Sequence, residues 1–103
     1  MINLPDNEYI SQLADVSIAG NYTFSAVIDN SYGADIVMRI EDESGRLVKS
    51  LKVGPTDGPE TKQLTAYLNA KNYIVRIRSE HMGCYIQSAQ LARGTTAEEF
   101  NLL

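Results

Sequence analysis

Tryptophan is absent from the sequence, which has only one cysteine and one histidine. Because Cys84 is the sole cysteine, no disulfide bond can form within the chain, which favours a reducing compartment. Nine lysine and arginine residues are outnumbered by thirteen aspartate and glutamate residues, giving a formal net charge of −4, and the basic residues form no run. A phosphate backbone requires a cationic stripe. We therefore expect neither nucleic acid nor an anionic membrane surface as a partner.

Long apolar stretches are also missing. No segment approaches the roughly 18 consecutive apolar residues of a membrane-spanning helix. Residues 1–6 have neither a positively charged segment nor a long apolar one, so the sequence predicts no signal peptide. The 103 residues, 44% of them hydrophobic and 21% charged, are enough for one domain with a modest core. We therefore predict a single domain over residues 1–103.

What the sequence does contain is an alternation of apolar and polar side chains between residues 16 and 91. Turn signals rich in Gly, Pro, Asn and Asp interrupt this alternation, most clearly at residues 30–33, 42–45 and 54–59. Turns about ten residues apart are typical of short antiparallel strands. We therefore predict an all-β protein, an antiparallel β-sandwich or jelly roll of seven to eight strands.

The alternation also predicts which side chains form the core. Leu47 is expected to share the inner face of its strand with Leu51 and Val53. Residues 9–13 fit either a helical turn or a first strand, and residues 92–103 fit a C-terminal tail or a short helix. The principal core residues are expected to be Tyr22, Phe24, Ile36, Met38, Ile40, Leu51, Leu64, Leu68, Tyr73, Val75, Ile77 and Ile86.

No arrangement of residues typical of catalysis stands out. His81 lacks the spaced partners of a catalytic triad or a zinc site, so we expect an exposed turn histidine. Cys84 opens a strand and is expected to act as a small half-buried hydrophobic residue. Residues 41–43 are acidic and allow either a calcium site or a hairpin turn; their spacing is not that of an EF-hand loop, so we expect no cofactor. The chain is therefore not expected to be an enzyme.

The six tyrosines indicate binding more than catalysis. An aromatic ring can stack on a sugar while neighbouring polar groups bond its hydroxyls, although tyrosine is also a common packing residue of strands. Two groups stand out, one in a loop at residues 30–32 and one on the strand at residues 85–87, and two arginines face outward on another strand. The candidate ligand or partner contacts are Tyr32, Asn30, Tyr85, Gln87, Arg76 and Arg78.

Four motifs occur in a characteristic order: Tyr-Thr-Phe-Ser-Ala at residues 22–26, Met-Arg-Ile-Glu-Asp-Glu-Ser-Gly at 38–45, Leu-Asn-Ala-Lys-Asn-Tyr at 68–73, and a closing strand with Ala-Gln-Leu at 89–91. Together they resemble the carbohydrate-binding-module-like jelly-roll domain of tailed-phage virion proteins. The resemblance covers about residues 20–100. The sequence departs from the family pattern where Lys71 replaces a glycine and where a frequent tryptophan is missing.

The resemblance implies a galactose-binding-like fold and a structural role in the virion. The leading expectation is a non-catalytic capsid decoration or cementing protein, made in the host cytoplasm and located in the virion. Its partner would be the major capsid protein or another virion protein, and the chain would pair with itself as a dimer or trimer. The alternative is a carbohydrate-binding module of a tail fibre or of a polysaccharide-degrading enzyme, with a glycan as partner.

Overall fold

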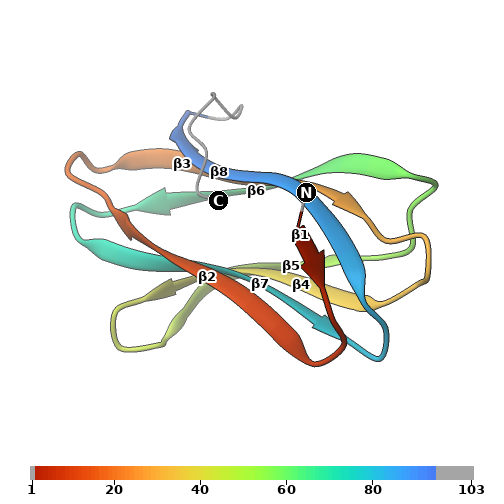
Figure 1. The fold of residues 1–103 in the computed structure, drawn as a ribbon. Helices are drawn as coiled ribbons and strands as arrows, with labels where there is room; N and C mark the ends of the chain where they lie inside the picture. The colour runs from red at the N-terminus through yellow and green to blue at the C-terminus, as the bar shows by residue number, and fades with distance from the viewer. Residues whose placement is uncertain (1, 95–103) are drawn as a thin grey trace.

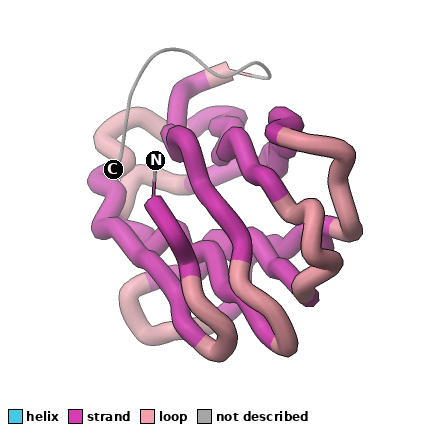
Figure 2. Tube along the Cα trace, turned by 45° about the vertical axis from the view of Figure 1, so that its right-hand side comes forward, coloured by secondary structure: helices cyan, strands magenta, loops and turns pink. Residues whose placement is uncertain are grey.

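Strands and the loops and turns that connect them make up residues 2–94, which are the residues that the computed structural model describes, and no helix occurs among them (Figure 2). Period-two alternation gives each strand one apolar face, and a strand can bury such a face only against a second layer. The strands are β1 (Ile2–Leu4), β2 (Glu8–Asp15), β3 (Gly20–Asp29), β4 (Asp35–Asp42), β5 (Leu47–Val53), β6 (Pro59–Leu68), β7 (Asn72–Glu80) and β8 (Cys84–Arg93).

The strands form two four-stranded sheets, in the orders β1-β8-β3-β6 and β2-β7-β4-β5 (Figure 1). Every neighbouring pair is antiparallel. The first sheet is the upper layer in Figure 1 and the second is the lower layer. This arrangement confirms the prediction of an all-β antiparallel sandwich.

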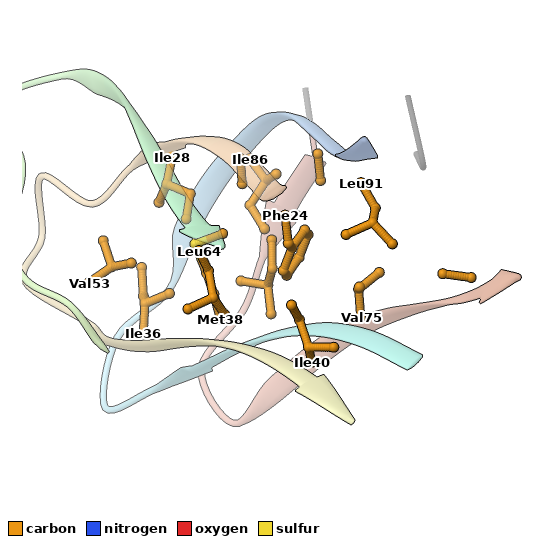
Figure 3. Packing of buried hydrophobic residues seen from close by; sticks show 14 of the residues in the cluster. Phe24, Ile28, Ile36, Met38, Ile40, Val53, Leu64, Val75, Ile86 and Leu91 are labelled. Carbon is orange, nitrogen blue, oxygen red and sulfur yellow. The ribbon is translucent and has the colours of Figure 1, made fainter. Parts of the chain in front are cut away.

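Apolar side chains from both sheets meet between the layers (Figure 3). Phe24 and Ile28 of β3 face Met38 and Ile40 of β4 across this space, and each of them is at most 1% exposed. Burying one such side chain contributes roughly 1.5–3 kcal/mol before conformational entropy is counted. Ten of the twelve predicted core residues are buried, while Tyr22 and Leu51 are partly buried and pack against the cluster.

The prediction that Leu47 shares the inner face of its strand is wrong, because β5 carries a bulge. Ile40 pairs with Lys49, but Glu41 pairs with Leu47, so one additional residue lies between the two pairs on β5. A bulge changes which side chains point inward beyond it. Leu47 therefore faces outward and is 46% exposed.

The first strands lie earlier in the chain than the alternation indicated. Residues 9–13, which fitted a helix or a strand, belong to β2, and residues 16–19 are not in a strand. Val16 is buried but Ile18 is 54% exposed. β1 and β2 supply one edge strand to each sheet. The prediction for the C-terminal tail or helix concerns residues 92–103, of which 95–103 lie outside the described residues.

Candidate functional site

The outward face of β2, β7, β4 and β5 gathers charged side chains in ordered rows. Strand register places Arg76 of β7 directly opposite Arg39 of β4. In the next row, Arg78 lies between Tyr9 of β2 and Val37 of β4. Because alternate residues of a strand share a face, both rows are on the side of the sheet that points away from the core. This face is the lower side of the molecule in Figure 1.

A buried carboxylate lies in the middle of this face. The side chain of Glu41 is only 5% exposed. The Nε atom of Arg39 donates a hydrogen bond to Oε2 of Glu41 at 2.8 Å, and a terminal nitrogen of Arg76 lies 3.7 Å from Oε1. A buried charge requires an opposite charge nearby, because its lost hydration must be offset. Glu41 therefore holds Arg39 in place and draws Arg76 toward the centre of the face.

Tyr9 lies beside this charged centre. The guanidinium carbon of Arg76 is 4.6 Å from the centroid of the Tyr9 ring, a cation–π contact. Tyr9 is 53% exposed, so it remains accessible from solvent. Sequence reasoning missed Tyr9, because the outward residues of β2 include the apolar Leu13 and the inward residues include the polar Gln12, so the alternation was indistinct.

The face is hollowed into a groove of about 600 Å³, within the size range of small-molecule binding sites. Its middle is lined by Arg39, Glu41, Arg76 and Arg78. At one end Glu80 forms an ion pair with Arg78, with an N–O distance of 2.9 Å. The groove, referred to below as the arginine groove, can therefore offer guanidinium donors in its middle and carboxylate acceptors at its ends.

The predicted contact residues do not come together at one place. Arg76 and Arg78 lie in the arginine groove. Tyr32 is 66% exposed in the loop between β3 and β4, beside a second hollow that shares residues with the groove at its Asp35 end. Tyr85 and Gln87 are exposed on β8, in the other sheet. The structure thus separates the candidates into a groove, a loop and the opposite layer.

Asn30 has a structural position, because it is completely buried. Its side-chain NH2 group donates hydrogen bonds to the carbonyl oxygens of Ala34 and Gly54, at 2.9 and 3.1 Å. Its side-chain oxygen accepts the N–H of Ala34 at 2.8 Å. This amide connects the β3–β4 loop to the segment that follows β5, and it has no free group to offer a ligand.

The remaining polar candidates are committed to local contacts. His81 is exposed and its Nδ1 atom contacts the carboxylate of Asp35, while Cys84 is buried, and this burial raises the pKa of its thiol. In the acidic segment, Asp42 accepts hydrogen bonds from Ser44 and from the N–H of Arg46. Between residues 2 and 94, no three His, Cys, Asp or Glu side chains are grouped so that they could hold a metal ion. Over the same residues, no helix is long and apolar enough to cross a membrane.

No protein-family profile and no curated protein sequence matches the chain. Solved structures do match it. The structure of TmCBM61 in complex with β-1,4-galactotriose aligns with a TM-score of 0.68 at 20% identity, covering 89% of this chain and 69% of that chain. The carbohydrate-binding module CBM6cm-2 from Cellvibrio mixtus lichenase 5A, in complex with cellotriose, aligns with a TM-score of 0.64 at 14% identity, covering 89% and 77%. The chain has a galactose-binding-like carbohydrate-binding-module fold.

A family 35 carbohydrate-binding module from Clostridium thermocellum shares this fold, with a TM-score of 0.61 at 20% identity over 84% of this chain and 70% of that chain. Identities of 14–20% establish the carbohydrate-binding-module fold alone. None of these three structures is described as a virion protein. The capsid-decoration role therefore stays a prediction that rests on sequence resemblance.

Proposed function

We propose that this chain is a non-catalytic carbohydrate-binding module that binds a glycan in the arginine groove. The observation that carries the proposal is the groove itself: a hollow of about 600 Å³ on the exposed face of one sheet, with donors, acceptors and an aromatic ring beside it. The similarity of the fold to that of sugar-bound modules supports the same proposal.

The chemistry of the groove suits a sugar. Sugar hydroxyls accept hydrogen bonds from guanidinium groups, such as those of Arg39 and Arg78, and donate them to carboxylates, such as that of Glu80. The exposed ring of Tyr9 offers an apolar surface against which the C–H groups of a sugar ring can pack. Glu41 holds Arg39 in one orientation before a ligand arrives, which reduces the entropy lost on binding.

The test is calorimetric titration of the protein with neutral and acidic oligosaccharides, beginning with galactotriose and cellotriose. We expect saturable binding of at least one glycan, and a loss of about tenfold in affinity for Tyr9→Ala. The matched control is Tyr67→Ala, because Tyr67 is 62% exposed and lies on β6 in the other sheet. This control is expected to bind within about twofold of the parent protein.

Two results would contradict the proposal. A blank titration against every glycan would remove the carbohydrate-binding function. Binding that is lost with Tyr32→Ala or Tyr85→Ala but kept with Tyr9→Ala would keep the function and move the site, to the β3–β4 loop or to the opposite sheet respectively.

A further inference from the structure

The middle of the arginine groove is more cationic than the protein as a whole. Arg39, Arg76 and Arg78 converge there in a chain whose net charge is −4. Two carboxylates contact these arginines: the buried one of Glu41, which contacts Arg39 and Arg76, and that of Glu80, which lies 2.9 Å from Arg78. Three guanidinium groups in contact with two carboxylates leave one positive charge in excess at this point, and an anionic ligand would complement it.

Two of these arginines are unfavourably placed in the absence of such a ligand. Arg39 and Arg76 are directly opposite each other on neighbouring strands, where Cβ atoms lie about 5 Å apart. Like charges at such positions repel each other. Glu41 is hydrogen-bonded to Arg39 but lies 3.7 Å from the nearest nitrogen of Arg76, so it offsets the second charge incompletely.

Arg76 also has hydrogen-bonding capacity that the protein leaves unused. A guanidinium group has five N–H donors. Within residues 2–94, Arg76 makes no hydrogen bond: its polar contact is the 3.7 Å approach to Glu41, and its buried Nε atom has no acceptor. The terminal nitrogens of Arg76 and the 52% exposed side chain of Arg78 lie on the same strand face, two residues apart. Together they can bind two oxygens of one anionic group.

The ends of the groove have the opposite charge. Glu80 is paired with Arg78, Asp35 contacts His81, and Glu43 belongs to the β4–β5 turn. These carboxylates favour neutral hydroxyl groups over further anions on either side of the cationic centre. The groove is therefore complementary to a ligand with one negative charge flanked by neutral sugar units.

We infer that the preferred ligand is an otherwise neutral oligosaccharide that carries one acidic sugar residue, whose carboxylate or sulfate group binds Arg76 and Arg78. This inference rests on the proposed function, since it names the class of glycan. The planar fork of a guanidinium group matches both a carboxylate and a sulfate group. The experiment below determines which of these two groups is bound.

The experiment compares pairs of ligands that differ only in charge. One pair is an aldotetraouronic acid, with one uronic acid among four sugars, and the same oligosaccharide after reduction of its carboxyl group. The other pair is a singly sulfated tetrasaccharide and its desulfated form. We expect the charged member of one pair to bind at least about tenfold more tightly at low salt. This preference should decrease between 20 and 500 mM salt, roughly as screening increases.

Variants locate the binding in the groove. Arg78→Gln removes the ion-pair partner of Glu80, which is partly exposed to solvent, so the change leaves no unpaired charge in the interior. Arg76→Lys keeps a positive charge near the buried Glu41 but removes the forked guanidinium donors. Each is expected to lose about tenfold in affinity for the charged ligand and little for its neutral form. Arg93→Gln makes the same change of charge at an exposed residue of the other sheet, and it should bind within about twofold of the parent.

The outcomes separate the two proposals. Equal affinity for charged and neutral members of both pairs would overturn the inference and leave the carbohydrate-binding function standing. Tighter binding of a polyuronate than of the singly charged tetrasaccharides would also overturn it, because the carboxylates at the ends of the groove would then not disfavour additional negative charges. A charge preference that survives both groove variants would place the acidic sugar elsewhere. Failure to bind any glycan would remove both proposals together.

Discussion

At the scale of single residues, Asn30 shows how a buried amide determines a loop. Its three side-chain hydrogen bonds engage Ala34 and Gly54, and its backbone N–H donates to the hydroxyl of Thr56 at 2.8 Å. Residues in loops are often read as functional, because loops carry most binding groups. Asn30 is buried and has a structural role instead, because its polar side chain supplies the hydrogen bonds that the backbone groups of the turn require.

Replacing the amide with a carboxyl group tests this role. Asn30→Asp keeps the acceptor for the N–H of Ala34 but places a second acceptor against two carbonyl oxygens. We expect a loss of about 1–3 kcal/mol in the free energy of unfolding at pH 7. Burial raises the pKa of such a carboxyl group above its unfolded value of about 3.9, so the loss should grow as pH rises from 4 to 7.

The measurement is urea unfolding of this variant and the parent at both pH values. Asn69→Asp is the control, because Asn69 is exposed, and it should stay within about 0.5 kcal/mol of the parent. A variant of Asn30 with the stability of the parent at pH 7 would show that the amide does not determine the loop.

At the scale of elements, the β4–β5 hairpin is held by one aspartate at its base. The Asp42 carboxylate accepts hydrogen bonds from the hydroxyl of Ser44 at 2.6 Å and from the N–H groups of Ser44 and Arg46, both at 3.0 Å. The Ser44 hydroxyl is the largest cause that holds the pKa of Asp42 below its ordinary value of 3.8. Gly45, which follows in this turn, has a φ of 85°, a conformation that glycine adopts without strain.

Removal of the Ser44 hydroxyl group should change the pKa of Asp42. We expect Ser44→Ala to raise the pKa of Asp42 toward 3.8, as observed by NMR titration of the carboxyl carbon. Because the folded-state pKa is lowered, the stabilisation from Asp42 is present above about pH 4 and is lost as pH falls through that lowered pKa. Ser50→Ala, an exposed change on β5, should leave the titration unmoved. An unchanged pKa in Ser44→Ala would contradict the hydrogen bond.

How far the sequence predicts each element depends on how clean its alternation is. Strands β3, β4 and β7 contribute to the core on every second residue, and their predicted core residues are buried except for Tyr22, which is partly buried. The bulge in β5 was not predicted, because an extra residue leaves no mark in composition. β2 was ambiguous because its exposed face carries Tyr9 and Leu13.

The candidate site was predictable only in part, for a related reason. Outward-facing Arg76 and Arg78 follow directly from the alternation of β7. The pairing of Arg76 with Arg39 depends on strand order, since β7 lies between β2 and β4. Period-two patterns give the face of a residue but not its neighbour on the next strand. The burial of Glu41 and the contact of Tyr9 with Arg76 therefore required the folded structure.

At the scale of the whole molecule, the first fifteen residues connect the two sheets. β1 pairs with β8 at the edge of one sheet, and β2 pairs with β7 at the edge of the other. Residues 5–7 carry the chain from one layer to the other (Figure 1). The segment thus closes one side of the sandwich. It also adds to the core the side chain of Leu4, which is only 2% exposed to solvent.

Removal of residues 1–6 should therefore weaken the entire sandwich. We expect the free energy of unfolding to fall by at least about 2 kcal/mol, because the burial of Leu4 and the hydrogen bonds to β8 are lost together. The edge of β8 would also be uncovered, and uncovered edges pair with other chains. Urea unfolding and analytical ultracentrifugation measure the two effects. Leu4→Ala in the full chain separates them: it should lose stability but keep the oligomeric state of the parent, since its backbone still covers β8. A truncated chain as stable as the parent would show that the sandwich closes without β1.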